Sequence, residues 1–401
     1  MQSAARKTIA QTAAEASAAE PSEQRARRIA VLLGAEIYQV HHVVEIAHEL
    51  ARQGASVEIL ETLPEALFEF LRLWREEGQP VSGRVLHTPF HLRMLQRLKF
   101  LGSLKTAVLR LPRNVRTLSE YDAIVTPTDH ARVLCSRLSP RPAMIYVNHG
   151  VGGRAASYSD KYLDFDFVVV ASRQDEKRLL ADGRITDGNY VVAGYPRFET
   201  ASRIAEAGRP KLFANDRPVV LFNPHSKRAL RSWERVARAL IDHAAQTDEF
   251  NLIVAPHIKL FGRRPRFLWR RWERLAVPDR VIVDLGSSRS LDMTYTLAAD
   301  VYAGDVSSQL YEFLSDPKPC VFLNAHGIQW RDDRDFRNWH LGDVAETPAE
   351  AIDAIRNAFE RHDIYRERQA ERIAEVRDVA PGAAARAAQA ILSFLDRSAD
   401  A

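Results

Sequence analysis

Residues 28–60 read RIAVLLGAEIYQVHHVVEIAHELARQGASVEIL, and this stretch decides the fold class of the chain. The apolar run Arg28–Leu33 predicts a short buried strand that ends at Gly34, and Ser56–Leu60 predicts a second strand. The segment between them predicts a helix that closes at Gly54, because apolar residues recur there at helical spacing. These positions are Val40, Val43, Val44, Ala47, Leu50 and Ala51. A strand, a helix and a second strand in this order begin a doubly wound sheet.

Several classes of protein are excluded by what this chain of 401 residues lacks. The loop Gly34-Ala35-Glu36 has no G-x-G-x-x-G fingerprint, which argues against a dinucleotide cofactor there. No apolar run is long enough for a membrane-spanning helix, and residues 1–27 lack the apolar core of a signal peptide. The formal net charge is only +4, so the whole chain is not a polycation. Cys135 and Cys320 both lie in apolar surroundings, which favours buried thiols over a disulfide framework or a metal cluster.

Two successive series of strands and helices predict an α/β protein of two Rossmann-like domains with a cleft between them. We expect a disordered tail over 1–27, a first domain over 28–200, a linker over 201–216, and a second domain over 217–362. A C-terminal helix and tail over 363–401 is expected to pack back on the first domain. The further predicted strands are Ala123–Thr126, Ala143–Val147, Phe167–Ala171, Tyr190–Ala193, Val219–Asn223, Asn251–Ala255, Val281–Asp284, Asp300–Ala303 and Cys320–Leu323. The predicted helices of the second series cover 231–246, 289–298, 307–315 and 348–361.

Ligands of open α/β sheets bind at the carboxyl ends of the strands, so the residues after each predicted strand are site candidates. In the first domain, one strand leads into His149 and Gly150. A histidine there is either a general base near neutral pH or a turn residue with a local hydrogen bond. Another strand leads into Gly194, Tyr195, Pro196 and Arg197. Arg197 either contacts a phosphate or belongs to a hinge that enters the linker.

In the second domain, the loop after Val219–Asn223 is rich in cations and hydroxyl donors. Its candidate ligands are Ser226, Lys227, Arg228 and Arg231. Such a loop before a helix suits an anion, although a solvated basic turn has the same composition. His257 follows the next strand, where it either contacts a ligand or caps a turn.

The most informative segment of the second domain is Gly304-Asp305-Val306-Ser307-Ser308, between a predicted strand and a predicted helix. Serine is a favoured N-cap, and the same helix end can instead hold a phosphate. Glu312 lies one turn into the helix, within reach of a ribose hydroxyl. A capping box would place this acid three residues after the cap. Capping alone therefore does not explain Asp305, the paired serines and Glu312 together.

With these segments in order, the chain resembles the CDP-glycerol glycerophosphotransferases of teichoic-acid synthesis, which are transferases of the GT-B fold. The resemblance spans residues 145–345 and includes Asp316, Lys318 and Pro319 after the paired serines. It implies that His149 is the general base on the acceptor hydroxyl and that His257 contacts the donor pyrophosphate. It further implies that Ser307 and Ser308 hold the donor phosphates and that Glu312 contacts the ribose. The second domain would then bind the donor and the first would present the acceptor.

Several positions depart from the pattern of this family. Val151-Gly152-Gly153 stands where the family has Thr-Pro, Val306 stands where it often has Tyr, and Asn223–Arg228 replaces Pro-Thr-Trp-Arg. These differences fit a divergent member or a sugar-transferring relative. The alternatives are a nucleotide-sugar glycosyltransferase, a UDP-sugar 2-epimerase of the same architecture, and a non-catalytic binding protein. The expected partners are a nucleotide-activated donor, CDP-linked by resemblance, and a polymer or lipid-linked acceptor, with no cofactor and no metal required.

Two segments, 90–116 and 259–280, interleave basic and apolar residues. This pattern is typical of peripheral contact with an anionic membrane, and it is equally that of solvated faces on ordinary core helices. No recognised nucleic-acid-binding module accompanies it, so a nucleic-acid partner is not expected. The sequence therefore predicts a cytoplasmic protein, with the inner face of the cell membrane as one location.

Overall fold

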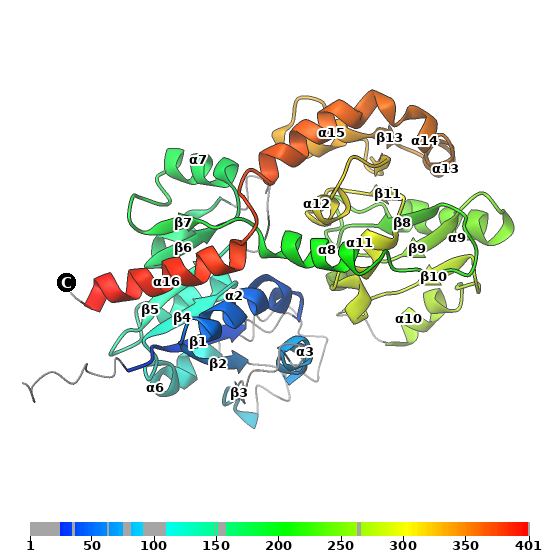
Figure 1. Ribbon diagram of the computed structural model, residues 1–401. Coiled ribbons are helices and arrows are strands. Elements are labelled where there is room, and N and C mark those ends of the chain that lie inside the picture. The colour runs from blue at the N-terminus through cyan, green and yellow to red at the C-terminus, as the bar shows by residue number, and fades with distance from the viewer. Residues whose placement is uncertain are drawn as a thin grey trace, which may run out of the picture.

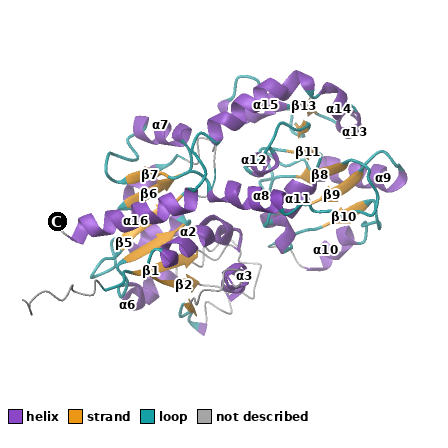
Figure 2. Cartoon of the chain, in the orientation of Figure 1, coloured by secondary structure: helices purple, strands orange, loops and turns teal. Residues whose placement is uncertain are grey.

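A computed structural model describes residues 25–33, 37–61, 64–74, 82–90, 110–148, 150, 158–262 and 266–399. Figure 1 shows two α/β lobes: the first half of the chain and the C-terminal helix form one, and most of the second half forms the other. Each lobe has a parallel sheet with helices on both faces, as Figure 2 shows by element type. The sequence prediction of two doubly wound domains is therefore confirmed.

The first sheet has the strand order β3-β2-β1-β4-β5-β6-β7. Its strands are β1 (Arg28–Leu33), β2 (Ser56–Glu61), β3 (Ser82–Val85), β4 (Ala123–Thr126), β5 (Ala143–Val147), β6 (Phe167–Val170) and β7 (Tyr190–Val192). Its helices are α2 (Val40–Arg52), α3 (Pro64–Trp74), α6 (Val115–Leu118) and α7 (Arg173–Ala181), with 3-10 turns η1 (Ile37–Gln39), η4 (Leu111–Asn114), η5 (Asp129–Leu134) and η7 (Asp160–Asp164). The order changes direction at β1 and β4, which places the start of α2 beside the point where ligands bind such sheets.

The second sheet has the order β10-β9-β8-β11-β12-β13. Its strands are β8 (Val219–Asn223), β9 (Asn251–Val254), β10 (Val281–Val283), β11 (Val301–Gly304), β12 (Cys320–Leu323) and β13 (Asp343–Ala345). Its helices are α9 (Trp233–Gln246), α10 (Arg266–Glu273), α11 (Thr294–Ala298), α12 (Gln309–Phe313), α13 (Pro348–Arg356) and α14 (Ala358–Arg361), with 3-10 turns η8 (Ile258–Leu260), η9 (Ser288–Ser290) and η10 (Arg334–Leu341). The order changes direction at β8 and β11, so their carboxyl ends are the corresponding ligand position in this domain.

Three helices join the two lobes. α8 (Pro196–Glu206) carries the chain from the first to the second, and α15 (Asp363–Val376) and α16 (Ala383–Ala399) carry it back. Buried apolar side chains of α16 complete the core between α2 and the first sheet, as the sequence leads us to expect. They are Ala384, Ala387, Ala388, Ile391 and Leu395.

The structure differs from the predicted elements at a few places. The C-terminal helix predicted within 363–401 is two helices, because the chain turns at Pro381 and Gly382, where glycine has a positive φ of 98°. The predicted linker begins inside α8, which continues to Glu206. β3 was not predicted, because it is an exposed edge strand without apolar alternation. In the part of the chain that the structure describes, no helix is long and apolar enough to cross a membrane.

Truncation of Ile391 tests the docking of α16. This side chain is fully buried against the first domain. Ile391→Ala is expected to lower the free energy of unfolding by about 2–5 kcal/mol, because it leaves a cavity. The matched control is Gln389→Ala on the exposed face of the same helix, expected to change stability by less than about 0.5 kcal/mol. Equal effects in denaturant unfolding would contradict this packing.

Candidate functional site

A pocket of about 230 Å³ lies between the two domains at the carboxyl edges of their sheets. The first domain and α8 contribute Tyr38, His42, Tyr195 and Arg197. The second domain contributes Pro256, His257, Ile258, Ser290, Leu291, Ser307, Ser308, Gln309 and Glu312. Of the residues predicted from the sequence, the structure therefore brings together His257, the two serines, Glu312, Tyr195 and Arg197.

His257 follows β9, from which it is separated by the two residues Ala255 and Pro256. Its Nδ1 accepts a hydrogen bond from the backbone N–H of Lys259 at 3.2 Å, so the side chain caps η8. Because Nδ1 acts as an acceptor, the neutral ring carries its proton on Nε2 and is a donor at that atom. The sequence offered two interpretations of His257, a turn cap and a ligand contact. The two are compatible, because Nδ1 caps the turn and Nε2 can donate to a ligand.

The paired serines have different local roles. Ser307 Oγ accepts a hydrogen bond from the backbone N–H of Gln309 at 3.2 Å, whereas Ser308 makes no side-chain cap bond. α12 begins at Gln309 and is five residues long, later and shorter than the predicted helix over 307–315. So short a helix contributes little macrodipole, and the polar character of this wall comes from the serine hydroxyls and nearby backbone N–H groups.

Glu312 and Arg197 form a buried ion pair at the pocket. Arg197 Nε donates to Glu312 Oε1 at 2.7 Å, and Arg197 Nη2 donates to the carbonyl oxygen of Leu291 at 2.9 Å. Burial opposes the charged guanidinium, but Glu312 and Tyr195 outweigh it and raise the pKa of Arg197. Glu312 Oε2 is buried and makes no hydrogen bond with the described residues. Arg197 thus uses Nε and Nη2 for intramolecular bonds, and the phosphate contact predicted as one of its roles stays a prediction.

Gly304 and Asp305 do not line the pocket. A Cβ on Gly304 would lie 2.9 Å from the backbone oxygen of Asn223 and 2.6 Å from Tyr302 Oη, so glycine is required by packing. Asp305 Oδ2 accepts the backbone N–H groups of His225 at 2.7 Å and Ser232 at 3.0 Å. Asp305 turns inward to hold the loop after β8, and the donor contact predicted for Gly304 and Asp305 stays a prediction.

The basic loop after β8 also lies outside the pocket lining. Arg231 pairs with Glu234 and donates to the carbonyl oxygen of Ser226 at 3.2 Å. Lys227 and Arg228 are exposed. The loop is therefore organised by Asp305 and by its own contacts, and its anion-binding role stays a prediction. His149 lies outside the described residues, and Gly150, which is partly exposed, is not part of the pocket lining.

Sequence reasoning missed Tyr38 and His42. Both follow β1 at the carboxyl edge of its sheet, a position that could have identified them. His42 Nδ1 lies 3.1 Å from Tyr195 Oη, and burial raises the pKa of this phenol, which stays neutral. Lys259 Nζ donates to Tyr38 Oη at 3.2 Å, a direct contact between the two domains.

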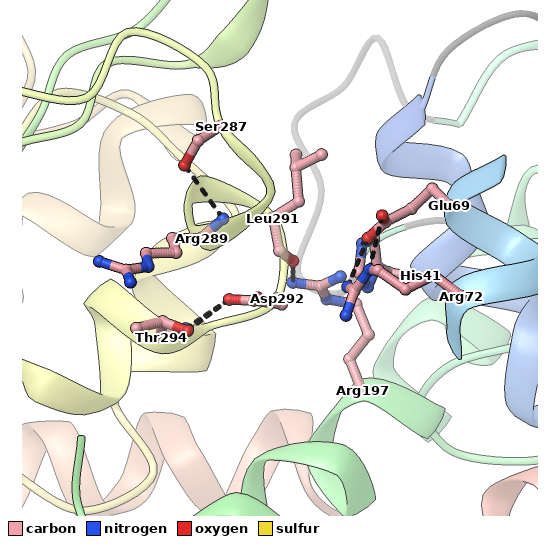
Figure 3. A network of polar contacts seen from close by, with 9 residues as sticks. All are labelled: His41, Glu69, Arg72, Arg197, Ser287, Arg289, Leu291, Asp292 and Thr294. Atoms are coloured by element: carbon pink, nitrogen blue, oxygen red, sulfur yellow. Dashed lines mark hydrogen bonds and ion pairs between the residues drawn. The ribbon is translucent and has the colours of Figure 1, made fainter. Parts of the chain in front are cut away.

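A polar network borders the pocket where α2, α3 and α8 meet the second domain (Figure 3). His41 Nε2 lies 3.3 Å from Glu69 Oε1, and Arg72 Nη2 donates to the same oxygen at 2.8 Å. Burial opposes ionisation of Glu69, but Arg72 and His41 outweigh it and hold its pKa at about 2. Burial also lowers the pKa of His41, so this ring stays neutral beside Arg197. Among the described residues, no group of three His, Cys, Asp or Glu side chains could hold a metal ion.

The family model described as CDP-Glycerol:Poly(glycerophosphate) glycerophosphotransferase matches residues 143–393. The chain belongs to this family. It is accordingly a transferase, as the resemblance of its motifs implies. No curated protein sequence matches the chain.

Solved structures that resemble this glycerophosphotransferase family member are enzymes of the GT-B fold. The Staphylococcus aureus MnaA–UDP structure is 12% identical, with a TM-score of 0.62 over 92% of this chain and 97% of that one. UDP-GlcNAc 2-epimerase from Neisseria meningitidis, bound to UDP-GlcNAc, is 13% identical, with a TM-score of 0.60 over 92% and 100%. The glycotransferase of kitacinnamycin is 16% identical, with a TM-score of 0.55 over 92% and 100%. At these identities the likeness establishes the fold, and the predicted GT-B architecture is confirmed.

The buried carboxyl of Asp305 gives a testable pH dependence. Burial raises its pKa to about 7, despite the backbone donors that favour the charged form. Between about pH 4 and pH 7 the folded protein therefore holds a proton that the unfolded chain releases, and stability falls as pH rises, by at most about 1.4 kcal/mol per pH unit. Asp305→Asn removes this titration, so its stability relative to the wild type is expected to increase from pH 5 to pH 8. If the difference in stability between Asp305→Asn and the wild type, measured by thermal unfolding, were constant from pH 5 to pH 8, the raised pKa of Asp305 would be contradicted.

Proposed function

We propose that the pocket is the donor site and that this transferase moves glycerol phosphate from CDP-glycerol to a hydroxyl group of a polymer or lipid-linked acceptor. The observation that carries the proposal is the meeting of His257, Ser308 and Glu312 in one pocket. They come from two strand-to-helix connections of the second domain: His257 follows β9, and Ser308 and Glu312 follow β11. An imidazole N–H and a hydroxyl can donate hydrogen bonds to a pyrophosphate, and a carboxylate can accept them from the hydroxyls of a ribose.

In this proposal the nucleotide lies along the second-domain wall. His257 Nε2 donates to the pyrophosphate, and Ser307 and Ser308 contact its oxygens. Glu312 Oε2 accepts from the ribose, since its other oxygen is bound by Arg197. Two of the structural neighbours contain UDP or UDP-GlcNAc, which supports a nucleotide-linked donor for this fold.

The transfer is then a displacement at phosphorus. The acceptor oxygen forms a bond to the phosphorus of the glycerol phosphate, and the bond from that phosphorus to the bridging oxygen of CMP breaks. CMP leaves with the electron pair, and the acceptor proton passes to a base, which by family resemblance is His149. The Nε2–H of His257 stabilises the charge that develops on the leaving phosphate. Tyr38 and His42 form the wall nearest the first domain, where the acceptor would enter.

A nucleotide-sugar donor remains the second candidate. Val306 and the segment Asn223–Arg228 depart from the family pattern on the donor side, and Asp305 turns this loop away from the pocket. These departures allow a donor with another base or another transferred group. A panel of test ligands therefore needs both CDP-alcohols and nucleotide sugars.

Donor identity is tested by thermal unfolding with CDP-glycerol, other CDP-alcohols, and UDP-, GDP- and CMP-sugars. We expect CDP-glycerol to give the largest rise in melting temperature, because a ligand of the folded state stabilises it by mass action. A ligand at 100 times its Kd contributes about 2.7 kcal/mol. A larger rise with a nucleotide sugar would replace the proposal by the second candidate.

The role of His257 is tested by turnover. His257→Leu is expected to lower kcat by about 10²–10³-fold, because leucine cannot donate a hydrogen bond to the developing oxyanion. The affinity for the nucleotide donor should change far less. The control His243→Leu alters a surface histidine that pairs with Glu249, 2.9 Å away and outside the pocket, and should leave kcat unchanged. Undiminished turnover of His257→Leu would remove this residue from the mechanism.

We also propose that α10 gives the enzyme peripheral contact with anionic membranes. Arg270, Arg271 and Arg274 are exposed, and Phe267 is 68% exposed on the same helix. The tryptophans of this segment do not belong to that surface, since both pack against the second-domain core. In the other basic segment, residues 91–109 lie outside the described residues.

Vesicle flotation tests this contact. Wild type is expected to float with phosphatidylserine vesicles at low salt and to dissociate as salt rises, because each arginine contributes about 1 kcal/mol near an anionic surface. Arg270→Gln with Arg271→Gln should weaken binding about tenfold or more. The control pair, Arg366→Gln with Arg368→Gln, removes two exposed charges from α15 and should bind as wild type does. Equal loss in both pairs, or no binding by wild type, would contradict the proposal.

A further inference from the structure

Arg197 lies at the end of the first domain, and its hydrogen-bond partners among the described residues, Glu312 and Leu291, both belong to the second domain. It lies in the first turn of α8, just after the Gly194 turn, where a positive φ of 93° suits glycine. Its bonds go to Glu312 on α12 and to the carbonyl oxygen of Leu291 after η9. α8 itself is attached to the first domain, since Thr200 and Arg203 both pair with Glu45 of α2.

The geometry of the pair leaves one carboxylate oxygen for another partner. An arginine that faces a carboxylate often binds both oxygens with two parallel N–H groups. Here Arg197 Nε donates to Glu312 Oε1, and Arg197 Nη2 donates to the carbonyl oxygen of Leu291 instead of the second carboxylate oxygen. Glu312 Oε2 therefore receives no hydrogen bond from the described residues. Glu312 as a whole residue is only 5% exposed, and it lines the pocket. A buried, ionised oxygen without a donor is costly unless a ligand supplies one.

The surroundings fix this arrangement. Tyr195 packs with Ala171, Tyr311 and Val376 in a small apolar cluster that α8 shares with α12 and α15. Both side chains of the pair are nearly inaccessible, at 5% and 6%. Figure 3 shows the Arg197 side chain between His41 and Glu69 on one side and Leu291 on the other. The guanidinium therefore has little room to move, and it holds Glu312 in a single orientation.

We infer that Arg197 is a positioning residue that holds Glu312 with Oε2 toward the ribose hydroxyls of the nucleotide. The inference rests on the proposed donor site but not on the identity of the base. α8 is attached to the first domain. Recognition of the ribose by Glu312 of the second domain therefore depends on Arg197, which does not belong to the second domain. Removal of Arg197 should therefore abolish ribose selectivity without removal of any group that contacts the ribose.

The test is the ratio of the Kd values for ribo- and 2′,3′-dideoxynucleotides, measured by calorimetry with CMP and UMP and their dideoxy forms. Wild type is expected to prefer the ribonucleotide by about 10- to 100-fold, as a charge-assisted hydrogen bond provides. Glu312→Gln and Arg197→Met should each reduce the ratio to near unity. The double variant R197M/E312Q should equal E312Q, because Arg197 acts through Glu312. It also removes both charges together, so it folds even if R197M alone does not.

Arg203→Met is the matched control, since it removes an exposed arginine from the same helix that pairs with Glu45. It should retain the full ratio. Three results would overturn the inference. They are an unchanged ratio in R197M, a lost ratio in R203M, and a wild type that does not discriminate in either nucleotide series. If discrimination occurs with UMP alone, the CDP-glycerol proposal fails while the role of Arg197 stands. Absence of any nucleotide binding contradicts both.

Discussion

The buried ion pair between Arg197 and Glu312 is the contact on which the pocket depends. It joins the helix that leaves the first domain to the helix that follows β11 in the second. Its removal by loss of one partner would leave an uncompensated charge in a site that excludes water, at a cost of about 3–5 kcal/mol. The pair thus constrains both the relative placement of the two domains at the pocket and the orientation of a pocket carboxylate. Tyr38 and Lys259 add a second contact between the domains at the opposite wall.

The rest of the site follows from the topology of two parallel sheets. Each sheet reverses its strand order at a pair of central strands, and the connections after those strands meet at the domain boundary. His42 and Tyr38 come from the first reversal, and the paired serines come from the second. His257 comes from the neighbouring strand β9. The topology of the two sheets therefore brings polar side chains of both domains to one pocket.

The sequence predicted the strands well, because buried parallel strands are short apolar runs. Five predictions, among them Val219–Asn223 and Cys320–Leu323, agree with the structure residue for residue. The sequence also identified His257, Ser308 and Glu312 as pocket residues, since strand ends mark the ligand edge. It did not predict that Asp305 accepts two backbone N–H groups of the loop after β8, because the direction of a side chain at a strand end depends on the neighbouring loop. It could not pair Arg197 with Glu312, which lie 115 residues apart and meet only when the domains pack.

The central claim is that this pocket holds the nucleotide donor of a glycerophosphotransferase. A crystal structure with bound CDP-glycerol tests it most directly. We expect the pyrophosphate within hydrogen-bond distance of His257 Nε2 and Ser308 Oγ, with a ribose hydroxyl on Glu312 Oε2. A nucleotide seated on the basic loop after β8, or a ribose turned away from Glu312, would contradict the account.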